Sequence, residues 1–181
     1  DLSKKNEINI SFRKKHGIPN ENFLIITGGK IDERKKIHFL LEAFKKTEES
    51  NISLVVFGVP NQEMEDAIKP YKNIENIVFT GWMDSVGIYE IMLSADLAIY
   101  PGTHSVLWEQ SIGVGIPCIF KRWEGIEHVD VGGNCIFLED SNVDEIISVL
   151  TKVIKDKELY KELKGNAMSL GTINFAYSEI A

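Results

Sequence analysis

The residues best suited to chemistry lie in YPGTHSVLWEQSIGVGIPCIF, residues 100–120. After a proline-glycine turn come Thr103, His104 and Ser105, which are expected to precede a helix and to leave backbone N–H groups open to an anion. Glu109 follows about one turn into that helix, where its carboxylate could accept hydrogen bonds from a diol such as a ribose. A structural histidine, and a glutamate that complements the helix dipole, would account for the same residues.

A second candidate is the glycine-rich loop GGKIDERKK, residues 28–36. Its two glycines let the backbone approach a ligand closely, and Lys30 and Lys35 lie near the start of the next expected helix. Amide groups and ammonium charges at a helix entrance together favour an anion. The loop has neither the GxGxxG fingerprint nor the P-loop motif, and a surface turn with solvated lysines is the alternative interpretation.

Two further loops carry weaker signals. In TGWMDS, Trp82 and Met83 follow a strand and place a flat aromatic ring and a thioether where a nucleobase could lie. A tryptophan that caps the core is the alternative. In GVPNQ, Gly58 breaks a strand. Cys118 and Cys135 lack metal-ligand spacing and are interpreted as buried free thiols in a reducing cytoplasm.

The elements that must position these loops are short apolar runs alternating with stretches of helical period. The runs are mostly continuous rather than alternating, which is typical of parallel strands covered on both faces. Strands are expected at 23–27, 53–58, 76–81, 96–100, 117–120 and 135–138. The pattern predicts an α/β fold, a Rossmann-like doubly wound parallel sheet of about six strands followed by two C-terminal helices. Ligands of such sheets bind beyond the carboxyl ends of the strands, where all of these loops fall.

Length and charge narrow the function classes. The 181 residues suit one domain. The chain starts without Met or an apolar leader and is expected to be part of a longer protein, with residues 1–20 as a linker or leading segment. The net charge of −7 argues against binding to nucleic acid or to an anionic membrane. No apolar run approaches the roughly 20 residues needed to span a bilayer.

Taken together, these loops resemble the C-terminal, donor-binding domain of the group 1 glycosyltransferases, retaining enzymes with two Rossmann-like domains (GT-B). The resemblance runs from about Phe23 to Leu170. GKIDERK is similar to the family's Gly-Arg-Leu turn and following Lys, with Gly29 in place, Lys30 at the Arg and Lys35 at the Lys. SADLAIYPG is similar to the strand that ends in Pro-Ser, and GVGIPCIF to the Ala-X-Gly-X-Pro-Val segment.

The sequence departs from the family at its pair of glutamates, which are separated by seven residues. The loop is shorter in this chain, and His104 stands in the region of the first glutamate. Counting back from Pro117 puts Gln110 in register with the second, one residue from Glu109. Both stay open as the ribose-binding residue, with Glu109 favoured because a carboxylate suits a diol. Lys30 keeps the charge of the family's Arg but loses its bidentate fork.

The resemblance implies a nucleotide-diphosphate-sugar donor, UDP- or GDP-linked, at the carboxyl edge of the sheet. It implies catalytic roles for Lys30 and Lys35, which would neutralise the leaving diphosphate, and for His104, which would face the donor sugar. The residues expected to bind the rest of the donor are Gly29, Gly58, Trp82, Met83, Thr103, Ser105, Val106 and Glu109. The family requires neither a metal nor a cofactor.

The resemblance also implies which larger enzyme this chain would belong to and where that enzyme would act. Residues 1–181 would be a single nucleotide-sugar-binding domain, the C-terminal half of a cytoplasmic enzyme of polysaccharide biosynthesis. A glycan or lipid-linked acceptor would bind through an N-terminal domain absent from this chain, and peripheral membrane association of the full-length enzyme is compatible with that role. The alternatives are a sugar-nucleotide epimerase of the same architecture and a non-catalytic α/β module that binds proteins. A nicotinamide-dependent dehydrogenase is disfavoured because GGKIDE lacks the third glycine.

Overall fold

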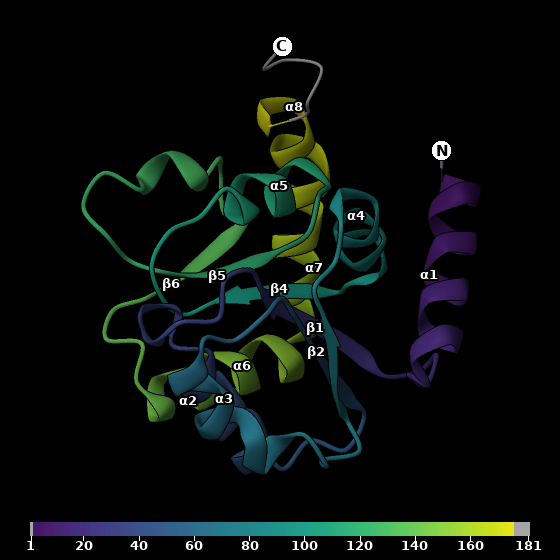
Figure 1. Cartoon of the computed structure of the whole chain (residues 1–181). Coiled ribbons are helices and arrows are strands. Elements are labelled where there is room, and N and C mark those ends of the chain that lie inside the picture. The colour runs from purple at the N-terminus through teal and green to yellow at the C-terminus, as the bar shows by residue number, and fades with distance from the viewer. Residues whose placement is uncertain (1, 176–181) are drawn as a thin grey trace.

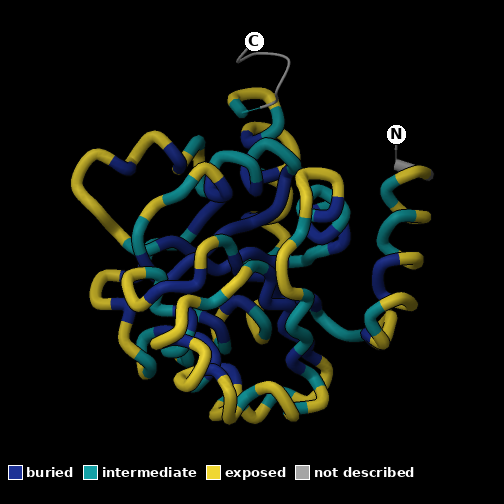
Figure 2. Tube along the Cα trace, in the orientation of Figure 1, coloured by how far each residue is buried: buried dark blue, intermediate teal, exposed yellow. Residues whose placement is uncertain are grey.

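The computed structural model describes residues 2–175 and has a six-stranded parallel sheet at its centre (Figure 1). The strands lie in the order β3-β2-β1-β4-β5-β6. Their bounds are β1 Phe23–Gly28, β2 Ile52–Phe57, β3 Ile77–Gly81, β4 Leu97–Tyr100, β5 Cys118–Lys121 and β6 Cys135–Leu138. The predicted doubly wound sheet is confirmed, and no expected strand boundary is off by more than one residue. Nearly continuous burial explains the accuracy for the central strands β1, β2, β4 and β5, which are dark in Figure 2.

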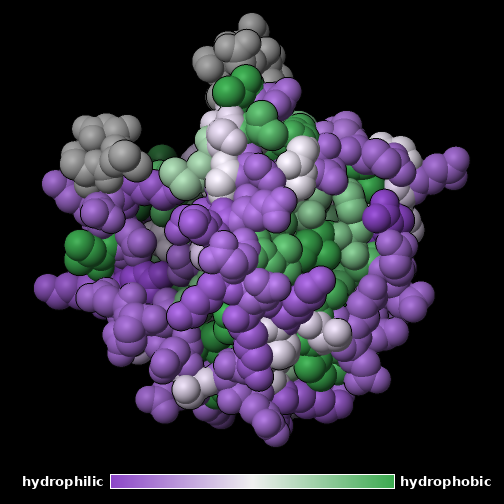
Figure 3. Space-filling model, turned by 180° about the vertical axis from the view of Figure 1, so that it is seen from behind, coloured by the Kyte–Doolittle hydropathy of each residue, from purple (hydrophilic) through white to green (hydrophobic). Residues whose placement is uncertain are grey.

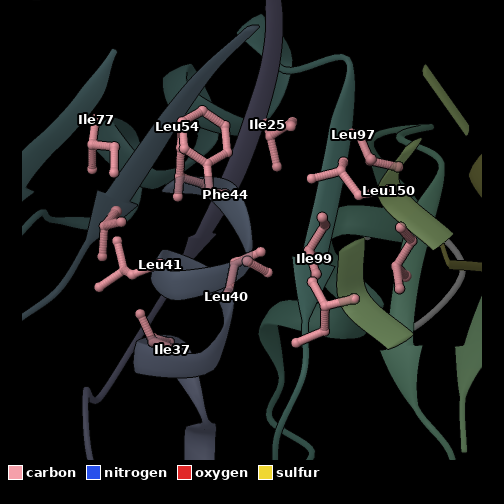
Figure 4. Close-up of a cluster of buried hydrophobic side chains, with 14 of the residues drawn as sticks. Ile25, Ile37, Leu40, Leu41, Phe44, Leu54, Ile77, Leu97, Ile99 and Leu150 are labelled. Atoms are coloured by element: carbon pink, nitrogen blue, oxygen red, sulfur yellow. The ribbon is translucent and has the colours of Figure 1, made fainter. Parts of the chain in front are cut away.

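Helices cover both faces of the sheet. Successive strand residues point to opposite faces, so Ile25 and Leu54 join one core while Leu24 and Ile26 join the other. The helices are α1 Leu2–His16, α2 Ile37–Lys46, α3 Gln62–Ile68, α4 Ser85–Ser94, α5 Leu107–Gly113, α6 Val143–Lys155, α7 Lys157–Asn166 and α8 Thr172–Phe175. The first core packs α2, α3 and α6 against the sheet, as Figure 4 shows for α2 and α6. The second packs α1, α4 and α5.

The leading segment is more structured than the sequence indicated. Residues 1–20 were expected to be a linker or leading segment, and 2–16 form α1. The helix has no apolar stripe, which is why its sequence did not predict it. It is held instead by isolated contacts: Phe12 and Ile18 are buried in the second core, and Arg13 pairs with Asp96 at 3.1 Å.

The N-termini of α4 and α5 are built differently. Asp84 caps α4, with its Oδ1 accepting a hydrogen bond from the Gly87 N–H at 2.8 Å. The residues 103–105 do not cap α5: its N-cap is Val106, which makes no side-chain cap bond. The N–H of Thr103 is already committed to the carbonyl of Arg34 at 3.0 Å, so this loop is tied to a neighbouring loop rather than to its own helix.

The C-terminal part contains the two predicted helices and a further segment. α6 and α7 meet at Asp156, and a π-helical turn then leads from Ala167 to α8. On the rear face, hydrophobic surface gathers near the centre among hydrophilic side chains (Figure 3). In the C-terminal part of the chain, Met168, Leu170 and Ile173 are exposed. The two thiols, Cys118 and Cys135, are free and buried as predicted, and burial raises the pKa of Cys135 to about 12.

Candidate functional site

Three loops meet at the carboxyl edge of the sheet through backbone contacts that exclude side chains. Gly58, at φ 109°, lies so close to the loop after β1 that a Cβ would fall 1.8 Å from the carbonyl oxygen of Gly29. Gly102, after β4, lies against the loop before α2, where a Cβ would fall 2.2 Å from the Arg34 carbonyl oxygen. Only glycine permits approaches this close, so the ends of β1, β2 and β4 form one packed surface.

A mostly apolar pocket of about 340 Å³ opens where β1, β2 and β3 end. It brings together five predicted site residues from three loops: Gly29, Lys30, Gly58, Trp82 and Met83. Trp82 is 74% exposed, so it forms a wall of this pocket rather than a cap on the core, the alternative that the sequence left open. A flat ligand with an apolar face fits such a surface.

Two cations lie beside this pocket in different environments. Lys30 is exposed, and its ammonium makes no hydrogen bond or ion pair to any other residue in 2–175. Lys35 is half-buried, and its ammonium donates hydrogen bonds to the carbonyl oxygens of Thr103 at 2.8 Å and His104 at 3.0 Å. Burial lowers the pKa of Lys35. The two predicted cations therefore lie on the β1 side of the edge, and Lys35 also holds the loop after β4.

The loop after β1 contains a further ion pair that the sequence reasoning missed. Arg34 binds the buried carboxylate of Asp32 at 2.9 Å. The hydrogen bond from Arg34 lowers the pKa of Asp32 and outweighs the opposing effect of burial. This pair stiffens the turn between Lys30 and Lys35 and neutralises one acidic charge close to them.

Beyond the lysines, Glu109 is bound by two histidines. Its Oε1 lies 2.7 Å from Nε2 of His104 and 3.4 Å from Nε2 of His128, while its Oε2 is buried and has no partner among the described residues. The ring of His104 packs edge-on against Trp108, with 5.2 Å between ring centroids. We call His104, Glu109 and His128 the histidine–glutamate cluster.

His128 was not among the residues singled out from the sequence. It lies in a short 3₁₀ turn, Glu127–Val129, on the connection between β5 and β6. The available signal was a histidine in the loop that follows β5, at the same sheet edge as His104. Its contact with Glu109 spans 19 positions, which spacing alone does not reveal.

The N-terminus of α5 adds backbone donors to the same edge. Among residues 2–175, the N–H groups of Ser105 and Val106 are not used by any hydrogen bond. The Ser105 carbonyl accepts a hydrogen bond from the Trp108 N–H at 2.9 Å, which starts the helix. Val106 itself is 64% exposed. Thr103, Ser105 and Val106 thus lie between Lys35 and Glu109, although the Thr103 N–H is occupied.

A family model for group 1 glycosyl transferases matches residues 9–169. The chain belongs to this family. The match begins within α1 and ends after α7, so it includes every loop described above. The fold and the predicted resemblance are therefore confirmed, whereas the roles of single residues stay predictions.

Relatives and solved structures agree with the family. An uncharacterised glycosyltransferase of Methanocaldococcus jannaschii is 22% identical over all of this chain and 48% of that protein. HepE of Anabaena, solved in complex with UDP-glucose, superposes with a TM-score of 0.80 at 16% identity over 96% of this chain and 50% of HepE. The C-terminal domain of a group 1 family protein of Francisella tularensis gives a TM-score of 0.75 at 19% identity, over 91% of both chains. The chain spans about half the length of the curated relatives it matches.

Two kinds of feature are absent from the described residues. In residues 2–175, no helix has both the length and the apolar character to cross a membrane. Within the same range, no group of three or more His, Cys, Asp or Glu side chains is arranged to hold a metal ion.

Proposed function

We propose that this chain is the donor-binding half of a glycosyltransferase that moves a sugar from a nucleotide-diphosphate sugar to a glycan or lipid-linked acceptor. The observation that carries the proposal is the convergence of three kinds of group at one sheet edge. These are the apolar pocket beside Trp82, the cations Lys30 and Lys35, and the carboxylate of Glu109.

The order of these groups matches the covalent order of such a donor. A base against Trp82 and Met83 would place the ribose and diphosphate next along the edge, near Lys30, Lys35 and the N–H groups of Ser105 and Val106. An anion held by cations and helix-start amides is favourable at this position. The transferred sugar would then lie on the β5 side, where His104 is found.

The proposed chemistry is stabilisation of a leaving group. When the bond between the sugar and the diphosphate breaks, the electron pair stays on the diphosphate, and Lys30 and Lys35 would stabilise the charge that develops there. The acceptor would bind through another domain of the full-length protein. We further propose that transfer is metal-independent, that the nucleotide is UDP or GDP, and that the enzyme works in the cytoplasm with peripheral membrane association.

Calorimetric titration of this chain with UDP, GDP and ADP tests the proposal. One diphosphate should bind selectively, and Lys35→Ala should weaken it about tenfold or more, because the variant removes a charge-assisted contact. Lys45→Ala is the matched control, since Lys45 is an exposed lysine of α2. No binding by the folded chain, or equal losses in the two variants, would contradict the proposal and favour a protein-binding module.

A further inference from the structure

A buried acidic side chain lies in the loop that supplies both proposed diphosphate cations. Asp32 is 7% exposed and stands between Lys30 and Lys35 in the chain. Its N–H donates to the carbonyl oxygen of Lys30 at 3.2 Å, and its own carbonyl oxygen accepts from the Lys35 N–H at 3.1 Å. A charge removed from water is poorly screened. An uncompensated carboxylate at this position would therefore oppose the binding of a diphosphate.

Arg34 compensates that charge. Its Nη2 donates to Oδ2 of Asp32 at 2.9 Å, and the pair joins a carboxylate that is 10% exposed to a guanidinium that is 72% exposed. The hydrogen bond from Arg34 is the largest influence that lowers the pKa of Asp32, and the charge of Lys30 acts in the same direction. The carboxylate therefore stays ionised at neutral pH and lies within electrostatic reach of Lys30.

The backbone of Arg34 is fixed between two loops. Its carbonyl oxygen accepts from the Thr103 N–H at 3.0 Å, and a Cβ on Gly102 would fall 2.2 Å from that oxygen. The guanidinium is thus held at Asp32 by a well-anchored residue rather than by a freely moving turn.

The Lys30 ammonium is the cation available to replace Arg34 at the carboxylate. It has no hydrogen bond or ion pair among residues 2–175 and belongs to the lining of the apolar pocket. The ammonium of Lys35, in contrast, already donates to two carbonyl oxygens of the loop after β4. Removing one partner of a buried ion pair leaves a charge that needs a new partner, whereas removing both partners costs little. Without Arg34, Asp32 would draw Lys30 away from the pocket.

We propose that Arg34 is a positioning residue for diphosphate binding: by holding Oδ2 of Asp32, it keeps the Lys30 ammonium free for the diphosphate of the donor. Arg34 acts through Lys30 and does not itself contact the ligand. The inference rests on the proposed function, because it concerns the availability of one of the two cations named there.

Calorimetric titration of the 181-residue chain with UDP, GDP and ADP tests this role, and the tightest of the three is used for the variants. The variants are Arg34→Ala, Lys30→Ala, and Arg34→Ala combined with either Asp32→Asn or Lys30→Ala. Arg122→Ala is the matched control, because it removes an arginine from the exposed ion pair with Glu139 after β5. Circular dichroism establishes that each variant is folded, and Arg34→Gln replaces Arg34→Ala if the alanine variant is not.

The expected result is a loss that a second substitution cancels. Arg34→Ala should weaken the nucleoside diphosphate about fivefold, because Asp32 is left uncompensated and captures Lys30. Adding Asp32→Asn should return the affinity to within about twofold of wild type, since the competing charge is then gone. In the Lys30→Ala background, Arg34→Ala should cost about twofold or less, because the cation through which it acts is already missing. Arg122→Ala should have almost no effect.

Three results would overturn the inference without touching the proposed function. A double variant with Asp32→Asn that binds as weakly as Arg34→Ala would mean that Arg34 contacts the diphosphate itself. Equal losses from Arg34→Ala with and without Lys30 would mean that Arg34 does not act through Lys30. Wild-type affinity in Arg34→Ala would leave the ion pair a structural role alone. Failure of the wild-type chain to bind any of the three nucleoside diphosphates would contradict the proposed function and this inference with it.

Discussion

The two edges of the sheet use polar groups in opposite ways. At the amino edge, the buried guanidinium of Arg13 donates to four acceptors, which are Asn9 Oδ1 at 2.6 Å, the carbonyl oxygens of Pro19 at 3.0 Å and Asn22 at 2.9 Å, and Asp96 Oδ2 at 3.1 Å. The same Asp96 oxygen accepts from the Leu24 N–H at 2.9 Å. At the carboxyl edge, the Lys30 ammonium, the N–H groups of Ser105 and Val106, and Glu109 Oε2 have no hydrogen-bond partner among residues 2–175.

Cavity volume alone would favour the amino edge as the binding site. The amino edge holds cavities of about 530 and 400 Å³, both larger than the 340 Å³ pocket at the carboxyl edge. The largest one includes polar groups that already satisfy one another, such as Arg13 and Asp96. Buried polar groups in folded proteins are normally paired, so unpaired groups mark a binding site better than volume does.

The largest effect is expected at Gly58, which lies both in the close packing between loops and in the lining of the pocket. In Gly58→Ala, the new methyl group would overlap the Gly29 carbonyl oxygen and the residue would keep an unfavourable φ of 109°. The free energy of unfolding should fall by about 4 kcal/mol from strain and overlap, and diphosphate binding should be lost. Gly165→Ala in α7 is the control, since nothing lies within 4 Å of its Cβ. Equal stability of the two variants in urea denaturation would contradict the packed-loop description.

Substitutions at the amino edge should lower the stability of the fold without changing diphosphate affinity. Arg13→Ala leaves Asp96 without its buried partner, and the free energy of unfolding should fall by about 3 kcal/mol. Diphosphate affinity, measured well below the melting temperature, should stay within twofold of wild type. Lys46→Ala, which breaks the exposed Lys46–Glu42 pair, should have no measurable effect in the same denaturation series. A large loss of diphosphate affinity in Arg13→Ala would show that the amino edge also contributes to ligand binding.

A third variant tests whether the part of the carboxyl edge beyond β6 contributes to diphosphate binding. Beyond β6, Glu145 accepts three backbone hydrogen bonds, from the N–H groups of Glu139 at 2.6 Å, Asp140 at 2.9 Å and Ser141 at 2.7 Å. Burial opposes ionisation, but these bonds prevail and lower the pKa of Glu145. Glu145→Ala should cost about 1 kcal/mol of stability without changing diphosphate affinity.

The pH dependence of that cost has a definite sign. Because the folded-state pKa of Glu145 is lowered, its contribution to stability is present above the unfolded value and is lost as pH falls through the folded one. The difference in unfolding free energy between wild type and Glu145→Ala should therefore shrink under acid conditions. A difference that is constant between neutral pH and pH 3 would exclude the proposed role of the three backbone bonds.

How much of this could be predicted from the sequence depends on whether the signal is local. The strands were found because each is a continuous apolar run, and the loop residues were found because each follows a strand. α1 was missed because Phe12 and Arg13 hold it through tertiary contacts rather than an apolar stripe. His128 was missed because only folding brings it to Glu109. The open N–H group expected at Thr103 was wrong because that group donates to the neighbouring loop.

The smallest expected effect is a pH dependence that links Lys35 to the ligand. Burial lowers the pKa of Lys35 in the free protein, and a bound diphosphate would raise it again by supplying negative charge. Between the two values the complex takes up a proton, so diphosphate affinity should fall, by about threefold, from pH 7.5 to pH 9.5. In Lys35→Arg the guanidinium stays protonated throughout, and the affinity should change less over this range. The same slope in Lys35→Arg as in wild type would mean that another group titrates, and that Lys35 supports the loop after β4 without contacting the diphosphate.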